Sequence, residues 1–221
     1  MEHGVNEQQV ESDSVAPRLW RAAVMSLALV VVIGLAAALW LGTRPVVTGT
    51  PSLPGTLGAW TFGPAASGAE SGGRLVLRAQ EADQVAYATS DLLLTDFVAE
   101  VRAAPLSGPE DAGYGLVVRY RAPDEFVTLL IGADGYIAVG QMSGGAWRWR
   151  VPWQQWPHIR RGSSENLLRA QCHADRCQFY VNDEFAFAVD AVSPQGRVGP
   201  AAWSPEAGRF SAEFRDWRVW K

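Results

Sequence analysis

The chain has 221 residues, of which 48% are hydrophobic and 19% charged, and its formal net charge is −4 at pH 7. This length is enough for one well-buried core beside a short additional segment. The acidic balance and the absence of a basic cluster argue against nucleic-acid binding, which needs many contacts to phosphates.

The N-terminal part of the chain contains one unbroken apolar run, residues 22–42, after a polar tail at residues 1–21. At about 1.5 Å per residue the run reaches roughly 30 Å, the thickness of a bilayer's hydrocarbon core. It predicts one transmembrane α-helix in contact with membrane lipid. A cleaved signal peptide is the alternative, although its apolar region is usually only about 7–15 residues long.

The charges that flank this run indicate its orientation. Arg18 and Arg21 precede it, whereas Arg44 alone follows it closely. The positive-inside rule therefore favours a cytoplasmic N-terminus and an extracytoplasmic C-terminal domain at the cell membrane. Residues 43–58 are rich in Pro, Gly and Thr and predict a linker between the membrane and that domain.

Residues 59–221 show a hydrophobic pattern of period two. In the segment 97–102, Phe97, Ala99 and Val101 share one face, and we assign them to a core. The segment 126–131 is apolar on both faces, which is typical of a central strand. No segment beyond residue 42 has a useful helical period, so many short strands with frequent turns predict an antiparallel β-sandwich.

Two further alternating segments lead to specific expectations. Tyr114, Leu116, Val118 and Tyr120 share one parity and are assigned to the core, which places Arg119 on the opposite face. Near the C-terminus the apolar phase shifts by one residue around residues 215–216, and this shift predicts a β-bulge.

Cys172 and Cys177 are the two cysteines of the chain, and strand-like sequence lies on both sides of the four residues between them. The spacing predicts a hairpin in which the two thiols face each other at a distance that a disulfide can bridge. Such a bond fits an oxidising compartment, and two small buried hydrophobic residues are the alternative. A metal site is not expected, because the two thiols and His173 would still lack a fourth ligand.

Several short motifs follow one another in a characteristic order: Gly115-Leu116-Val117-Val118-Arg119, Glu125-Phe126, Asp134-Gly135-Tyr136, Trp156, Asn166-Leu167-Leu168, Phe179-Tyr180-Val181-Asn182, Gly196-Arg197-Val198-Gly199 and Phe214-Arg215-Asp216-Trp217-Arg218-Val219. Over residues 59–221 this order resembles the concanavalin A-like lectin/glucanase superfamily, which includes laminin G-like and keto-disaccharide-hydrolase-like domains. The resemblance implies an all-β antiparallel jelly-roll sandwich with a concave sheet face that often binds glycans. It does not imply one activity, since members include lectins, glycosidases and adhesion modules.

No catalytic residue is predicted. Retaining glucanases of this fold carry a Glu-x-Asp-x-Glu strand, whereas the nearest fragment here, residues 81–83, lacks the third carboxylate. No nucleophile elbow or phosphate loop occurs, and no cofactor is expected. Calcium binding at Asp134 or Asp183, as in some laminin G-like domains, is an alternative to the ordinary roles of these residues in turns.

Aromatic residues are the better indication of a binding site. Trp147, Trp149, Trp153 and Trp156 lie within ten residues, interleaved with arginines. Exposed Trp rings stack on sugar rings. Because Trp147 and Trp149 share strand parity, we assign both to the core. The predicted ligand-binding residues are Glu100, Arg119 and Gln141 on the concave sheet face, with Trp153 and Trp156 beside it. A merely solvated sheet face is the alternative for the three polar residues.

The sequence therefore predicts a membrane-anchored extracytoplasmic binding module without catalytic activity, which recognises a glycan or a partner protein. One alternative is an accessory subunit of a larger membrane protein complex, held by its helix. Another is a glycoside hydrolase of the keto-disaccharide-hydrolase-like type, whose catalytic residues the sequence does not reveal.

Overall fold

The computed structural model describes residues 53–55, 59–191 and 193–221. Within these ranges, no helix is long and apolar enough to cross a membrane. The predicted transmembrane helix at residues 22–42 and the tail at residues 1–21 lie outside them. Of the predicted linker, only residues 53–55 are described, and they form a short strand.

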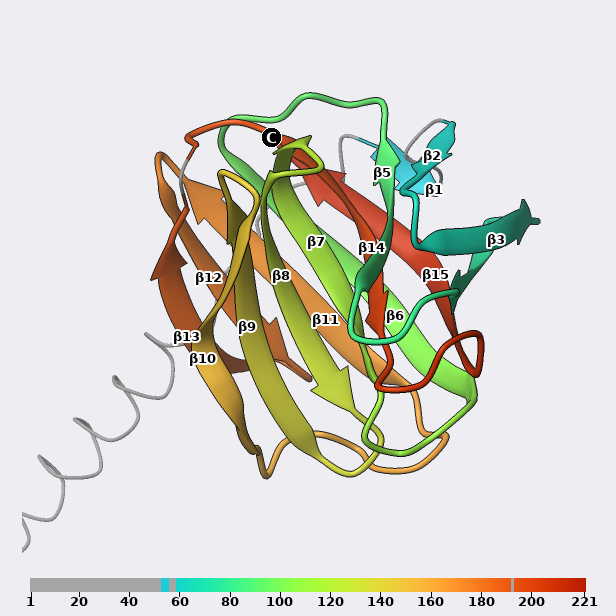
Figure 1. Cartoon of the computed structure of the whole chain (residues 1–221). Helices are drawn as coiled ribbons and strands as arrows, with labels where there is room; N and C mark the ends of the chain where they lie inside the picture. Colours follow the sequence, from blue (N-terminus) through green and yellow to red (C-terminus); the bar gives the residue numbers. More distant parts are fainter. Residues whose placement is uncertain (1–52, 56–58, 192) are drawn as a thin grey trace, which may run out of the picture. The chain divides into compact units, whose positions relative to one another are not determined.

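The described residues form an antiparallel β-sandwich of two sheets, as the alternating pattern predicts (Figure 1). In the eight-stranded sheet the order is β13 (Glu184–Asp190), β12 (Arg176–Val181), β11 (Asn166–His173), β6 (Phe97–Ser107), β15 (Phe210–Trp220), β4 (Arg74–Ala79) and β3 (Ala66–Ser71), and β1 (Leu53–Gly55) also pairs with β15. In the seven-stranded sheet the order is β10 (Ala146–Gln155), β9 (Tyr136–Ser143), β8 (Glu125–Gly132), β7 (Gly113–Ala122), β14 (Arg197–Trp203), β5 (Val85–Ser90) and β2 (Trp60–Phe62).

The main core lies between the two sheets and contains the side chains that the alternation assigns to it. Phe97, Ala99 and Val101 of β6 are buried there, which confirms the prediction for that strand. The doubly apolar segment 126–131 belongs to β8, which lies between β7 and β9 and is buried along almost its whole length. Burial of both faces explains why this strand has no polar side.

The cysteine hairpin is also confirmed. Cys172 on β11 and Cys177 on β12 occupy directly opposed positions and form a disulfide. Both side chains are buried in the main core, at most 1% exposed. The bond closes the hairpin at its turn end, where Ala174 adopts a positive φ of 49°.

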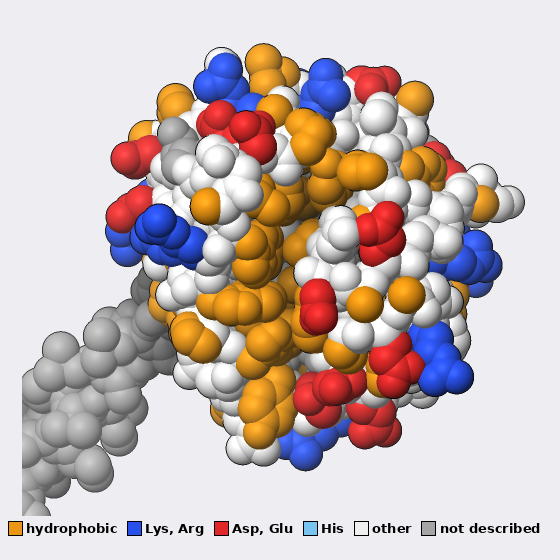
Figure 2. All heavy atoms as spheres, viewed as in Figure 1, with side chains coloured by type: hydrophobic (Ala, Val, Ile, Leu, Met, Phe, Trp, Pro, Cys, Tyr) orange, Lys and Arg blue, Asp and Glu red, His pale blue; other side chains and the backbone are white. Residues whose placement is uncertain are grey.

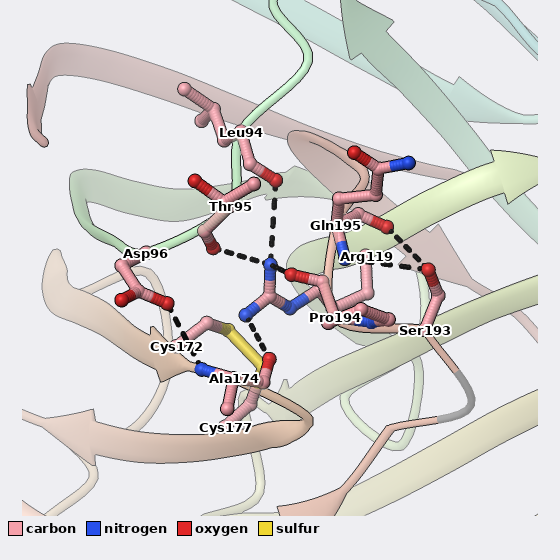
Figure 3. The surroundings of a disulfide bond; sticks show 10 residues. All are labelled: Leu94, Thr95, Asp96, Arg119, Cys172, Ala174, Cys177, Ser193, Pro194 and Gln195. Carbon is pink, nitrogen blue, oxygen red and sulfur yellow. Dashed lines mark hydrogen bonds between the residues drawn. A yellow bond between two sulfur atoms is a disulfide. The ribbon is translucent and has the colours of Figure 1, made fainter.

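The predicted position of Arg119 is wrong. Arg119 has a φ of 55°, and the ladder between β7 and β8 is irregular between Val118 and Ala122. This irregularity reverses the alternation, so the guanidinium is fully buried and Tyr120 lies on the outer face instead of in the main core. Figure 3 shows the guanidinium beside the disulfide, donating hydrogen bonds to backbone carbonyls of Leu94, Thr95, Ala174 and Pro194.

A second irregularity lies where the sequence predicts it. The pairing of β15 with β6 shifts register between Arg215 and Arg218, and Asp216 has a φ of 56°. Phe214 before the bulge and Trp217 and Val219 after it are all buried in the main core. The one-residue phase shift therefore keeps the long strand apolar towards the core at both ends.

Candidate functional site

A second hydrophobic cluster lies on the outer face of the seven-stranded sheet, where a sandwich usually presents polar residues to solvent. It includes a continuous set of aromatic side chains, which we call the aromatic band: Tyr87, Tyr120, Phe126, Trp147, Trp149, Trp153 and Trp203. Figure 2 shows hydrophobic side chains running down this face of the molecule. A large apolar strip on the outside of a sheet commonly marks a binding surface.

The rings of the aromatic band contact one another from end to end. Tyr87 lies 5.0 Å from Tyr120 and 5.3 Å from Phe126, measured between ring centroids. The series continues through Phe126–Trp147 at 6.3 Å, Trp147–Trp149 at 5.1 Å, Trp149–Trp153 at 5.7 Å and Trp153–Trp203 at 5.8 Å. Such contacts hold each indole in a defined orientation.

Glycines in the sheet allow the rings to lie directly on the backbone. A Cβ atom at Gly140 would come within 2.1 Å of Cζ2 of Trp147. A Cβ atom at Gly113 would come within 2.8 Å of Cη2 of Trp153. The missing side chains therefore make room for the indoles on the outer face of the sheet.

A hollow lies at each end of the aromatic band. The first, of about 270 Å³, is lined by Tyr87, Phe126, Met142 and Trp147 and by polar groups that include Asp83. The second, of about 220 Å³, is lined by Asp111, Asp134, Tyr136, Trp153 and Trp203. Apolar walls with a few convergent polar groups are typical of small-molecule sites.

The polar groups of these hollows have identifiable partners. The Tyr87 hydroxyl lies 3.5 Å from that of Tyr120 and donates to it, and burial raises the pKa of Tyr87, so its phenol is neutral at physiological pH. Asp134 Oδ1 accepts a hydrogen bond from the backbone N–H of Tyr136 at 3.1 Å. This bond fixes the turn between β8 and β9 and leaves the other carboxylate oxygen of Asp134 available.

The two tryptophans predicted to bind ligand, Trp153 and Trp156, lie in different hydrophobic clusters. Trp153 belongs to the aromatic band, whereas Trp156 packs against the main core, with its ring 5.5 Å from Phe187. The assignment of Trp147 and Trp149 to the core is wrong, because both lie on the outer face. They share a face, as their parity predicts, but it is the opposite face of the sheet.

The three predicted polar residues do not meet. Glu100 lies on the eight-stranded sheet, only 7% exposed, with Oε2 at 2.7 Å from Arg169 Nη2. Gln141 lies opposite Val127, a residue of the main core, and accepts a hydrogen bond from Arg150 at 2.7 Å. Arg119 is bound to the loop carbonyls described above. None of the three therefore belongs to the aromatic band.

Six residues of the band were not predicted as ligand-binding from the sequence and also belong to the candidate site: Tyr87, Tyr120, Phe126, Trp147, Trp149 and Trp203. Tyr87 lies in β5 and Trp203 ends β14, and side-chain alternation along a strand does not show which face of the sheet is exposed to solvent. Within the described residues, no group of three or more His, Cys, Asp or Glu side chains is placed to hold a metal ion. Asp183, one of the two residues considered for calcium, forms an ion pair of 2.7 Å with Arg169.

Comparisons with known proteins identify the type of sandwich. No family model matches the chain, and no curated protein matches it either. The carbohydrate-binding module CBM66 from Bacillus subtilis superposes with a TM-score of 0.61 and 17% identity, covering 74% of this chain and 96% of that chain. The GH43 protein BlXynB from Bacillus licheniformis superposes with a TM-score of 0.56 and 18% identity, over 75% of this chain and 37% of that chain.

A third match has the lowest identity of the three. LamAcat from Zobellia galactanivorans superposes with a TM-score of 0.53 and 10% identity, over 78% of this chain and 98% of that chain. At such identities the likeness concerns the fold, and function has to be argued from the site. The chain thus has the two-sheet antiparallel β-sandwich fold that is also found in a carbohydrate-binding module and in glycoside hydrolase proteins.

Proposed function

We propose that the β-sandwich is a glycan-binding module and that the aromatic band is its binding surface. The observation that carries this proposal is the group of Trp149, Trp153 and Trp203, which are partly exposed and hold one another in place beside a hollow. Indole rings bind the apolar C–H faces of sugars, and rigid rings lose little conformational entropy when they do so.

Polar groups around the second hollow complement the rings. The carboxylates of Asp111 and Asp134 accept hydrogen bonds from sugar hydroxyls, and the phenol of Tyr136 both donates and accepts them. The first hollow offers Asp83 and Gln84 beside Tyr87. Because both ends of the band have this composition, the surface suits an extended glycan of several sugar units better than a single sugar.

Glycoside hydrolysis is the second candidate function. Asp111 and Asp134 come from different connections, β6–β7 and β8–β9, yet line the same hollow. Hydrolysis needs two carboxylates on either side of the scissile bond, one acting as acid and the other as base or nucleophile. Release of reducing sugar from a bound glycan, abolished by Asp134→Asn, would favour this candidate over binding alone.

We propose in addition that the module is anchored to the cell membrane by residues 22–42 and lies outside the cytoplasm. The length of the apolar run supports the anchor. The disulfide between Cys172 and Cys177 supports an oxidising compartment. Alkylation of intact cells with a membrane-impermeant thiol reagent, with and without prior reduction, tests the location: the thiols should react only after external reduction.

A glycan array probed with the full-length protein tests the binding function. We expect one class of neutral glycan to bind, and titration of the same glycan should change the tryptophan fluorescence, because the band contains four indoles. Titration with oligosaccharides of increasing length should show affinity that rises over several sugar units. If no glycan binds at millimolar concentration, the proposed function is wrong.

A further inference from the structure

The edge strand β10 presents different chemistry on its two sides. Trp147 and Trp149 lie on the outer face, in the aromatic band, and the intervening Arg148 and the following Arg150 alternate with them. The two arginines line a separate hollow of about 360 Å³ together with Gln141 and Ser143 of β9. We call this hollow the arginine pocket, and the aromatic band contributes no residue to it.

The charges of the arginine pocket are not neutralised. Within the described part of the chain, eight arginines form ion pairs with carboxylates, but Arg148 and Arg150 form none. Glu125 of β8 lies opposite Ser143, and its carboxylate is 4.0 Å from the guanidinium of Arg121. The pocket therefore carries two positive charges in a molecule whose net charge is −4.

A buried side chain fixes one of the two guanidinium groups. Gln141 is 5% exposed, and its Oε1 accepts a hydrogen bond from Arg150 Nη1 at 2.7 Å. This bond occupies the side-chain oxygen of Gln141 on the side that faces Arg150. The groups that remain are the other guanidinium N–H donors, the amide N–H donors of Gln141 and the hydroxyl of Ser143.

We propose that the arginine pocket binds an oxyanion: a carboxylate, sulfate or phosphate group. Planar guanidinium groups bind such oxygens through paired, charge-assisted hydrogen bonds. The volume of about 360 Å³ exceeds that of an inorganic ion, so the pocket has room for part of an organic molecule that carries the anion. The inference does not depend on glycan binding at the aromatic band, because the two sites use different residues.

Calorimetric titration of the full-length protein at low ionic strength tests this proposal, since salt screens exposed charges. The probes are inorganic sulfate and glucuronate, with glucose as the matched neutral compound. The test variant is Arg148→Ala/Arg150→Ala. Arg78→Ala is the control, because Arg78 is exposed on β4, forms no ion pair among the described residues, and lies outside the pocket.

We expect sulfate, glucuronate or both to bind, the double variant to weaken binding at least about tenfold, and Arg78→Ala to have no effect. Replacement of both arginines by lysine should give intermediate binding, because the charge remains while the paired donors are lost. Binding of sulfate alone or glucuronate alone would define the preferred anion. The proposal is overturned if neither anion binds, if the double variant weakens the binding of glucose as much as that of glucuronate, or if the double variant and the Arg78 control behave alike. Failure here with intact glycan binding at the band would leave the proposed function unaffected.

Discussion

Trp149 and Trp203 meet edge to face with their ring centroids 6.5 Å apart, although four strand-to-strand steps separate β10 from β14 in the sheet. At about 4.8 Å per step, a flat sheet would hold the two backbones roughly 19 Å apart. The rings meet because both indoles are long side chains that extend towards each other over a face where residues such as Gly113 have no side chain. This convergence joins the two ends of the aromatic band's tryptophan series across the outer face of the seven-stranded sheet.

Removal of an indole from the aromatic band should weaken glycan binding without unfolding the domain. Trp153→Ala or Trp203→Ala removes a stacking surface, and we expect a loss of about 1 kcal/mol or more, about fivefold in Kd. Fluorescence or calorimetric titration with the glycan identified on the array measures it. Phe185→Ala is the control, since Phe185 is an exposed aromatic on β13 of the other sheet. Equal losses in the control and the tryptophan variants would contradict the assignment.

The space above Gly140 should be needed for the position of Trp147. A Cβ at Gly140 would overlap the Trp147 ring. We therefore expect Gly140→Ala to displace this indole and to reduce the free energy of unfolding by about 1–3 kcal/mol. Denaturant unfolding followed by tryptophan fluorescence measures both effects. The double change Gly140→Ala/Trp147→Ala should be less unstable than the sum of the two single changes; simple additivity would count against the contact.

The disulfide should stabilise the domain by a modest amount. Cys172 and Cys177 are five positions apart, so the bond closes a small loop and restricts the unfolded chain only slightly. We expect Cys172→Ala/Cys177→Ala to lower the free energy of unfolding by about 2 kcal/mol. Urea unfolding with and without reductant measures this, and the reductant should have no effect on the double variant. A wild-type protein insensitive to reductant after complete reduction would contradict the expectation.

Arg119 should be among the residues most sensitive to substitution. Its guanidinium is buried and joins three connections through the carbonyls of Leu94, Thr95, Ala174 and Pro194. Arg119→Met fills similar volume but leaves these carbonyls without their donor, at a cost of about 3 kcal/mol or more. Thermal and denaturant unfolding measure the loss.

The control for this substitution is Arg197→Met, because Arg197 is only partly buried and forms no ion pair among the described residues. Arg119→Lys should fall between wild type and Arg119→Met, since an ammonium group can satisfy some of the carbonyls. A loss no larger than that of the Arg197 control would show that the loop carbonyls find other partners.

Protonation of Asp96 should reduce the free energy of unfolding of the domain in acid. Its Oδ1 accepts a hydrogen bond from the backbone N–H of Ala174 at 2.9 Å, and this bond, followed by the proximity of His173, lowers the pKa of Asp96 below its ordinary value of 3.8. A depressed pKa in the folded state means that the stabilisation is present above the ordinary value and is lost as the pH falls through the folded-state value.

The variant Asp96→Asn tests this pH dependence. An amide oxygen can still accept the hydrogen bond from Ala174 but does not titrate, so stability should vary less between about pH 5 and pH 2 than in wild type. Denaturant unfolding at several pH values provides the measurement. An unchanged pH profile in Asp96→Asn would mean that other carboxylates dominate the acid response.

Much of the fold is predictable because strand alternation is a local property. The core positions Phe97, Ala99 and Val101, the cysteine hairpin and the bulge in β15 all follow from short stretches of sequence. Arg119 shows where this reasoning fails. A single residue with positive φ reverses which face of the sheet the next side chains of the strand point to. Neither Arg119 nor Tyr120 carries a sequence signal for that conformation.

The sequence by itself determined that residues 59–221 alternate as strands, that Cys172 faces Cys177, and that Trp147 and Trp149 share a face. Only the tertiary structure decided that this face is the outer one and that Trp203, four strands away, completes the surface with Trp149 and Trp153. The physical reason is that side-chain parity specifies which residues point the same way. The packing of the second sheet decides which side is covered, and the arrangement of strands that are distant in sequence decides which rings meet.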